Sequence, residues 1–167
     1  MAKRARLQKT NALRELERAG IAFEPFEYPV DGDNVERGYG AHVAEMLGED
    51  PACSFKTLVM VTPSGGHVVC CVPVEEEVDL KKAALAAGEK SLTMLHVRDL
   101  EPLTGYVRGG CSPVGMKKRL PTIIDETAQL FDRVNVSGGR RGLSIRLSPD
   151  DLVAFTQATL ADICREG

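Results

Sequence analysis

The sequence lacks the features that would place it in a membrane or around a metal ion. It has no run of about 18 apolar residues, so it predicts no membrane-spanning helix, and no apolar segment follows the basic N-terminus, so we expect no secretory signal. The five cysteines and three histidines have neither CxxC nor other metal-ligand spacing. We therefore expect no metal and no cofactor, and we interpret the cysteines as small apolar residues in a reducing cytosol.

Common nucleotide-binding and nucleophile motifs are missing as well. The segment SGGRRG lacks the GxxxxGK(S/T) spacing, and GYVRGG does not match GxGxxG. There is no GxSxG elbow, and no Ser-His-Asp set can be assembled by spacing. The net charge of −3 argues against a general nucleic-acid coat protein. If the protein is an enzyme, it has no obvious nucleophile of its own, and any phosphate contact must come from a local basic patch.

The sequence does contain an irregular alternation of helical and extended patterns, which predicts one mixed α+β domain. Two apolar strands, residues 56–62 and 67–74, are joined by PSGG and form the clearest hairpin. The second is apolar nearly throughout, as expected of a strand with both faces covered. The other predicted strands are residues 21–28, broken by Pro25, and residues 122–125, 133–138 and 143–148.

Helix-start and helix-stop signals predict the helices. They cover residues 10–19, 41–47, 79–87 and 96–105, and a last helix opens at residue 148. Asp79 and Ser148 are the expected N-caps of the third and the last of these. The last helix is expected to carry an apolar stripe of Leu152, Phe155, Leu160 and Ile163. Residues 29–40 are polar and turn-rich, so we expect a loop there.

Three glycine-bearing segments adjoin the predicted strands, and glycine lets a backbone approach a ligand closely and present its N–H groups. They are residues 104–113, 112–125 and 136–145, and their cations include Lys117, Lys118, Arg119, Arg140 and Arg141. Each segment alone is better explained as a turn with solvated charges. Because the same pattern recurs in consecutive connections between elements, it favours a site for an anionic ligand such as a phosphate.

Lys56 lies at the start of the apolar strand of residues 56–62. A lysine there can extend its ammonium to solvent along the apolar surface. It can equally hold a phosphate or polarise a carbonyl next to a glycine-rich loop. The spacing alone leaves both interpretations open.

Four segments resemble the YbaK/EbsC family of aminoacyl-tRNA deacylases, in particular its Cys-tRNA(Pro) deacylase branch: FKTLV, VDLKKAA, TGYVRGGCSPVGMKKRLPTIID and VSGGRRGL. The likeness extends from about Asn11 to the C-terminus. The family is related to the editing domain inserted in bacterial prolyl-tRNA synthetases. The resemblance therefore implies a curved, mixed, barrel-like β-sheet flanked by helices. We expect a single domain of residues 10–167, preceded by a flexible arm of residues 1–9 that the short basic N-terminal sequence indicates.

The resemblance implies a cytoplasmic trans-editing enzyme that binds the acceptor end of mischarged tRNA and clears Cys-tRNA(Pro), with Cys-tRNA(Cys) as a further candidate substrate. In this family the substrate's own thiol is thought to attack its ester carbonyl and release a thiolactone, which suits a chain without an obvious nucleophile. Prolyl-tRNA synthetase is a candidate partner. Two alternatives stay open: a deacylase for another small residue, as in Ala-tRNA(Pro), and a non-catalytic module that binds tRNA or a synthetase.

The family's functional positions can be carried over one by one. Lys56 matches the essential lysine, and Gly109 and Gly110 match a loop whose amides should face the ester carbonyl. The implied substrate-binding residues are Tyr28, Tyr39, Thr57, Ser137 and Ser144. The implied tRNA phosphate contacts are Lys117, Lys118, Arg140 and Arg141. Arg119, next to Leu120 and Pro121, is expected to be structural.

Two positions depart from the family pattern. Tyr39 stands where close bacterial relatives have phenylalanine, and Ser144 stands where an aspartate is expected. The loss of that carboxylate implies either an altered amino-acid selectivity or a dispensable group. Cys111 directly follows the glycine loop, but we predict that it is not the nucleophile, because the resemblance assigns the attacking thiol to the substrate.

Overall fold

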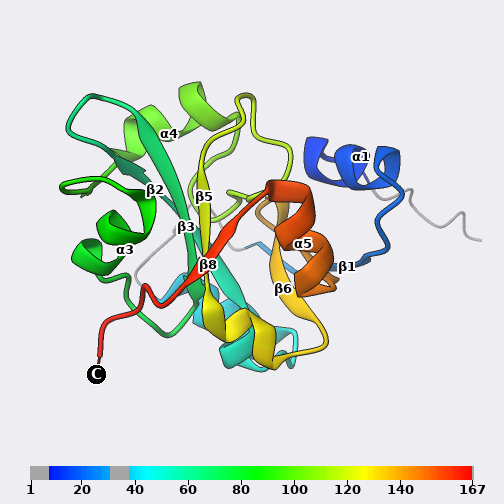
Figure 1. Cartoon of the computed structure of the whole chain (residues 1–167). Coiled ribbons are helices and arrows are strands. Elements are labelled where there is room, and N and C mark those ends of the chain that lie inside the picture. The colour runs from blue at the N-terminus through cyan, green and yellow to red at the C-terminus, as the bar shows by residue number, and fades with distance from the viewer. Residues whose placement is uncertain (1–7, 31–37, 167) are drawn as a thin grey trace, which may run out of the picture.

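The computed structural model describes residues 8–30 and 38–166, so residues 1–7 of the expected N-terminal arm lie outside it. The strands form two sheets, one in the order β1-β7-β6 and one in the order β4-β2-β3-β5-β8 (Figure 1). An isolated parallel bridge between Ser54 and Asn135 links the two sheets, but within the described residues they do not close into a complete barrel. The predicted mixed α+β fold is confirmed.

Helices and strands follow one another irregularly along the chain. The strands are β1 (Glu24–Glu27), β2 (Phe55–Val61), β3 (His67–Pro73), β4 (Thr93–Met94), β5 (Thr122–Asp125), β6 (Val134–Arg140), β7 (Leu143–Leu147) and β8 (Thr159–Ala161). The helices are α1 (Asn11–Arg18), α2 (Tyr39–Met46), α3 (Leu80–Ala87), α4 (Val97–Thr104) and α5 (Pro149–Thr156), with short 3-10 turns η1 (Pro51–Cys53) and η2 (Glu126–Leu130). None of the described helices is long and apolar enough to cross a membrane.

The β2–β3 hairpin forms the centre of the larger sheet, as the sequence predicts. β2 pairs antiparallel with β3 over its full length, and β3 pairs parallel with β5. Alternate residues of β3 face opposite cores: Val69 and Cys71 pack in a cluster with α1, β6 and β7, whereas Cys70 packs in a cluster with Ala83 and Ala84 of α3. Both faces of β3 are therefore covered, which explains its almost continuously apolar sequence.

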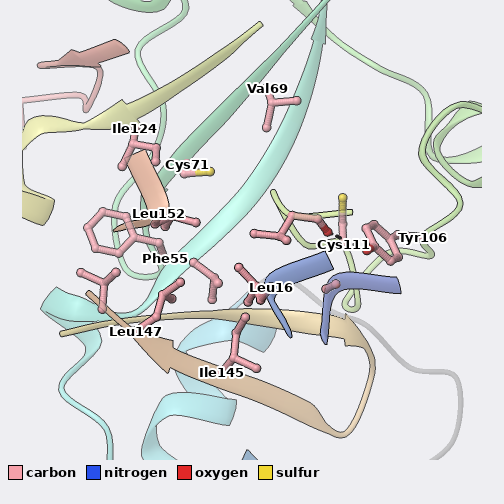
Figure 2. Packing of buried hydrophobic residues seen from close by; sticks show 14 of the residues in the cluster. Leu16, Phe55, Val69, Cys71, Tyr106, Cys111, Ile124, Ile145, Leu147 and Leu152 are labelled. Atoms are coloured by element: carbon pink, nitrogen blue, oxygen red, sulfur yellow. Dashed lines mark hydrogen bonds between the residues drawn. The ribbon is translucent and has the colours of Figure 1, made fainter. Parts of the chain in front are cut away.

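The larger of the two cores fixes the smaller sheet against the hairpin. Figure 2 shows Leu16 of α1, Phe55 of β2 and Ile145 of β7 in this cluster, and all three are nearly inaccessible to solvent. Figure 1 shows α1 and α5 to the right of the larger sheet and α3 to its left. Burying one Leu or Phe side chain contributes on the order of 2 kcal/mol. The cluster therefore holds β2, β6 and β7 in a fixed relation, and these strands carry much of the site.

Local capping explains where two helices begin. At the start of α3, Asp79 accepts hydrogen bonds from the N–H groups of Lys81 and Lys82, both at 3.0 Å. At the start of α5, Ser148 accepts one from the N–H of Asp151 at 3.4 Å. These side chains satisfy N–H groups that have no partner within their helix. Both N-caps predicted from the sequence are confirmed.

Tertiary context overrides two expectations near the N-terminus. Pro25 does not break β1: the strand lies at the edge of the smaller sheet, where Pro25 stands opposite Ile145, and an edge tolerates a residue without an N–H. α2 begins at Tyr39 instead of residue 41, so Tyr39 belongs to a helix and not to the expected loop. Residues 31–37 of that loop lie outside the described ranges.

The last helix is shorter than predicted. α5 ends at Thr156, Gln157 adopts a left-handed φ of 56°, and the chain turns into β8. Leu160 belongs to β8 and Ile163 lies beyond it, so the predicted apolar stripe is shared between a helix and an extended segment. The two-residue strand β4 has no counterpart in the prediction either. Segments this short carry too few apolar residues to distinguish a helical from an extended period.

Candidate active site

A cavity of about 800 Å³ is lined by residues of α2, β2, α4, β6 and β7 and of the segment 108–111. It brings together seven of the residues proposed from the sequence: Tyr28, Tyr39, Lys56, Thr57, Gly109, Ser137 and Ser144. The other five proposed residues do not line it: Gly110, Lys117, Lys118, Arg140 and Arg141. The cavity is therefore built from segments near both ends of the chain and from the central hairpin.

Lys56 is the second residue of β2 and lies half-buried at the cavity. Its neighbour Phe55 packs into the larger core, because successive side chains of a strand point to opposite faces. No residue that the structure describes forms a hydrogen bond or an ion pair with the Lys56 ammonium. A compact ammonium without a protein partner can bind a phosphate or a carbonyl oxygen of a ligand.

Gly109 and Gly110 have different structural roles. Gly109 lines the cavity and has a φ of 85°, which residues with a side chain rarely adopt. The N–H of Gly110 donates to the carbonyl oxygen of Val107 at 2.9 Å. A Cβ at Gly110 would lie 2.8 Å from backbone atoms of Arg140, so this glycine lets the loop rest against the β6–β7 hairpin. The backbone of Gly109 therefore faces the cavity, whereas Gly110 packs against the β6–β7 hairpin.

Tyr28 and Ser137 are held by the backbone around the β6–β7 turn. The N–H of Tyr28 donates to the carbonyl oxygen of Gly142 at 2.9 Å. Burial raises the pKa of Tyr28 well above its usual range, and a side-chain hydrogen bond with Tyr39 acts in the same direction. Ser137 Oγ accepts a hydrogen bond from the N–H of Gly139 at 3.1 Å. Tyr28 is therefore a neutral phenol that can donate a hydrogen bond at the cavity wall.

Glu49 is a cavity residue that the sequence did not indicate. It follows α2, lines the cavity and is only 7% exposed. Burial raises the pKa of its carboxyl, whereas the charge of Arg146 and the hydroxyl of Ser144 act in the opposite direction. Its Oε2 is buried and has no hydrogen-bond partner among the described residues. No sequence motif marks this position, because its burial depends on how α2 packs and not on the neighbouring residues.

A buried polar network joins the two sheets beside the cavity. Arg146 Nε donates to Asn135 Oδ1 at 3.0 Å, and Asn135 Nδ2 donates to Ser54 Oγ at 3.3 Å. Arg146 also stacks on Phe26, with its Cζ 4.7 Å from the ring centroid. Asn135 is 3% exposed, so these bonds are shielded from water and stabilise the bridge between the sheets.

Cys111 lines the cavity but is not activated for attack. It is 7% exposed, and burial raises the pKa of its thiol to about 12. The histidines of the chain, His42, His67 and His96, all lie outside the cavity lining. Across the described residues, no three His, Cys, Asp or Glu side chains are grouped to hold a metal ion. Burial therefore argues against Cys111 as a nucleophile, because the thiolate is the reactive form.

The basic segment 117–119 lies outside the cavity. Lys117 and Lys118 are exposed, and Lys118 borders a second hollow of about 210 Å³. Arg119 donates to the carbonyl oxygen of Phe155 at 2.8 Å, and its Cζ lies 5.9 Å from the Phe155 ring centroid. Arg119 thus ties this segment to α5, the structural role expected from the sequence.

Arg140 and Arg141 flank the β6–β7 turn and are engaged by other parts of the chain. Arg140 Nη2 lies 3.4 Å from Glu27 Oε2, and Arg141 Nε donates to the carbonyl oxygen of Arg108 at 2.8 Å. Arg108 is itself an exposed residue of the cavity lining. It was not among the residues proposed from the sequence, although it directly precedes Gly109. Lys56 and Arg108 are therefore the described cations that line the cavity.

The fold and the cavity residues agree with a known class of domain. Residues 39–155 match the family described as the aminoacyl-tRNA editing domain, and the chain belongs to this family. A curated relative from Enterococcus faecalis, named as a candidate Cys-tRNA(Pro)/Cys-tRNA(Cys) deacylase, EbsC, is 44% identical over 163 residues, which are 98% of each chain. The resemblance identified from the sequence is confirmed.

Two solved structures have the same fold. One, described as a candidate trans-editing enzyme for prolyl-tRNA synthetase, is 28% identical with a TM-score of 0.80, and the match covers 94% of this chain and 96% of that chain. The other, described as hypothetical protein APE2540, is 22% identical with a TM-score of 0.81, and the match covers 93% of this chain and 100% of that chain.

Proposed function

We propose that the protein is a trans-editing deacylase that clears Cys-tRNA(Pro), with Cys-tRNA(Cys) as a further substrate. The near-full-length relative named for this activity supports the proposal. The observation that carries it is the cavity itself, which combines a Lys56 ammonium without a partner among the described residues with a Cys111 thiol held in its protonated form. A cavity that offers charge but no activated nucleophile suits a substrate that brings its own thiol.

In the proposed reaction the substrate's thiolate attacks the carbonyl carbon of the ester that links cysteine to the terminal ribose. A carbon–sulfur bond forms and the ester carbon–oxygen bond breaks. The thiol proton ends on the released ribose hydroxyl, so the products are uncharged tRNA and cysteine thiolactone. The attack is intramolecular, and well-oriented intramolecular reactions reach effective molarities of about 10⁵ M or more. Orientation of the substrate can therefore supply much of the rate.

The protein's part in this reaction is to orient the ester and stabilise its oxyanion. Lys56 would hold the terminal phosphate or polarise the carbonyl, and the Gly109 amide would donate to the developing negative charge. Gly110 would act through the packing of the loop, because its own N–H already donates to Val107. The side chains proposed to orient the substrate are Tyr28, Tyr39, Thr57, Ser137 and Ser144.

Binding of the tRNA beyond its acceptor end is proposed to be weak. Lys117 and Lys118 are exposed and can contact phosphates, whereas Arg140 forms an ion pair with Glu27. Arg140 and Arg141 are retained as proposed phosphate contacts at the rim of the turn. With a net charge of −3, the protein has little long-range attraction for nucleic acid. Prolyl-tRNA synthetase as a partner and a cytoplasmic location, where tRNA is charged, are part of the proposal.

A deacylation assay with separately charged tRNAs tests the function. Cys-tRNA(Pro) and Cys-tRNA(Cys) are expected to lose their amino acid at least about 10-fold faster than Ala-tRNA(Pro), because only cysteine carries the attacking thiol. The thiolactone product is trapped and identified by mass spectrometry. Faster release of alanine would favour a deacylase for another small residue. Binding of tRNA without any deacylation would favour a non-catalytic module.

A further inference from the structure

Three glutamates line the cavity, and their environments differ sharply. Glu75 and Glu77 are exposed, whereas Glu49 is 7% exposed. The Oε2 atom of Glu49 is buried and has no hydrogen-bond partner within the described part of the chain. A buried polar group without a partner is unfavourable by about 1–3 kcal/mol, and more when it is charged. A buried carboxylate oxygen of this kind, at the wall of a cavity, can accept a hydrogen bond from a ligand.

The side chains next to Glu49 do not form a hydrogen bond with its Oε2 atom. The charge of Arg146 favours the ionised carboxylate, but Arg146 Nε is engaged by Asn135 Oδ1 at 3.0 Å. The Ser144 hydroxyl also interacts with Glu49, yet it donates at 3.4 Å to the carbonyl oxygen of Val136. Neither side chain satisfies Oε2. A carboxylate oxygen accepts hydrogen bonds and binds most strongly to a charged donor, so the missing group is best met by a ligand cation.

We propose that Glu49 binds the α-ammonium group of the aminoacyl ester and is therefore a substrate-positioning residue of the cavity. This inference rests on the proposed function, because an aminoacyl ester carries its ammonium on the carbon next to the reacting carbonyl. Lys56 and Glu49 place a basic and an acidic side chain in the same cavity. Lys56 then binds the phosphate or the carbonyl oxygen, and Glu49 binds the ammonium on the carbon next to that carbonyl. Glu49, which follows α2, would then supply a carboxylate to a cavity in which position 144 is a serine.

Two non-hydrolysable analogues test this role: terminal adenosine linked by an amide to cysteine, and the same compound made with 3-mercaptopropionic acid, which lacks only the α-ammonium. The unmodified full-length protein is expected to bind the cysteinyl compound about 10- to 100-fold more tightly, as one charged hydrogen bond predicts. Glu49→Gln keeps the shape of the side chain and removes its charge, so it should bind the two compounds equally. Glu45→Gln alters an exposed glutamate of α2 and should keep the full preference.

The amide compounds separate this inference from the proposed function, because their binding does not depend on turnover. A protein that binds them with the expected preference but fails to deacylate Cys-tRNA would refute the proposed function and support the role of Glu49. Equal binding of the two compounds by the unmodified protein overturns the inference, and so does a preference that survives in Glu49→Gln. Binding of neither compound overturns it as well.

A second measurement separates binding from a purely structural role. Glu49→Gln replaces a buried carboxylate whose Oε2 has no hydrogen-bond partner among the described residues, so its thermal unfolding temperature should equal or exceed that of the unmodified protein. Ser144→Asp, introduced into Glu49→Gln, places a carboxylate beside the same space and should restore the preference for the α-ammonium. A lowered unfolding temperature with an unchanged preference would show that Glu49 only supports the fold, and would overturn the inference.

Discussion

Lys56 and Cys111 line the same cavity, and their surroundings give them opposite chemical characters. The Lys56 ammonium is half-buried and has no partner among the described residues. The Cys111 thiol is so deeply buried that its pKa is raised to about 12. At the scale of single residues, the cavity therefore contains a positive charge and a thiol that stays protonated. Substitution of each residue tests this contrast.

Lys56→Ala is expected to lower kcat/KM for Cys-tRNA deacylation by at least about 100-fold, because it removes the charge proposed to bind the phosphate or the oxyanion. Lys56→Arg should also be poor, since a planar guanidinium does not replace a compact ammonium. Thermal unfolding should show that both variants are folded. Lys81→Ala, at an exposed position of α3, is the matched control and should keep full activity. Near-normal turnover by Lys56→Ala would remove this lysine from the mechanism.

Cys111→Ala is expected to keep deacylation of Cys-tRNA within about 3-fold of the unmodified protein, because a thiol with a pKa of about 12 is protonated at neutral pH. Replacing the substrate's cysteine with serine should slow release sharply, since a hydroxyl is far less ionised and less nucleophilic than a thiol. Both rates are measured with radiolabelled aminoacyl-tRNA. An inactive Cys111→Ala, together with Ser-tRNA cleaved as fast as Cys-tRNA, would restore a nucleophile of the protein.

The buried thiols also predict how stability depends on pH. Burial raises the pKa of Cys70, Cys71 and Cys111 from the ordinary 9.0 to about 12. Above about pH 9 the unfolded chain loses these protons while the folded protein keeps them. Stability should therefore be fully present below pH 9 and fall between pH 9 and 12, by up to about 1.4 kcal/mol per pH unit and thiol.

Urea unfolding between about pH 7 and pH 10.5 measures this decline, with Cys71→Ala as the comparison. The variant should be less stable at pH 7, because it loses packing in the larger core. Its free energy of unfolding should nevertheless fall less steeply above pH 9, because one protonated thiol has been removed. Parallel declines in the two proteins would contradict the assignment.

At the scale of elements, the segment 105–116 depends on its contact with the β6–β7 hairpin. A Cβ at Gly110 would lie 2.8 Å from backbone atoms of Arg140 and Arg141, which cannot move aside as a flexible side chain could. The neighbouring Gly109 and Arg108 line the cavity. The position of the loop, and with it one wall of the cavity, is therefore fixed by a close approach of two backbones.

Gly110→Ala is expected to destabilise the protein by about 1–3 kcal/mol and to raise KM, because relief of the overlap must displace the loop. Chemical denaturation and steady-state deacylation measure the two effects. Gly65→Ala is the control: Gly65 has a φ of 86° but open space around it, so it should lose about 1 kcal/mol from backbone strain and keep its activity. Unchanged KM in Gly110→Ala would show that the loop position does not matter.

Local signals in the sequence were sufficient for the elements that depend on local interactions. The β2–β3 hairpin and the caps Asp79 and Ser148 are decided by residues a few positions apart, and they were predicted. Pro25 within a strand, the end of α5 at Thr156 and the strand β8 depend on distant partners, and they were not. The candidate site shows the same difference. Lys56 could be proposed because its segment resembles a known family, whereas the burial of Glu49 results only from tertiary packing.

At the scale of the whole molecule, the proposed reaction site and the proposed tRNA contacts lie in different places. The net charge is −3, and the exposed Lys117 and Lys118 lie away from the cavity. Lys117→Ala combined with Lys118→Ala is expected to raise KM for Cys-tRNA and to reduce the slope of log KM against log salt by about one per lost phosphate contact. Turnover of a minimal cysteinyl-adenosine ester should stay unchanged. Loss of activity on the minimal ester would place these lysines in the reaction itself.

The pairing of β1 with β7 has a consequence for the order in which the protein folds. Thr10 donates a hydrogen bond to the carbonyl oxygen of Gly138, 128 positions away, and Arg140 pairs with Glu27 across 113 positions. Contacts of such long range must overcome a large loop-closure entropy and form slowly. The hairpin that carries Lys56 can form from neighbouring residues during synthesis. Tyr28 follows β1 and joins the cavity through the pairing of β1 with β7, so we expect the cavity to be among the last parts of the molecule to be completed.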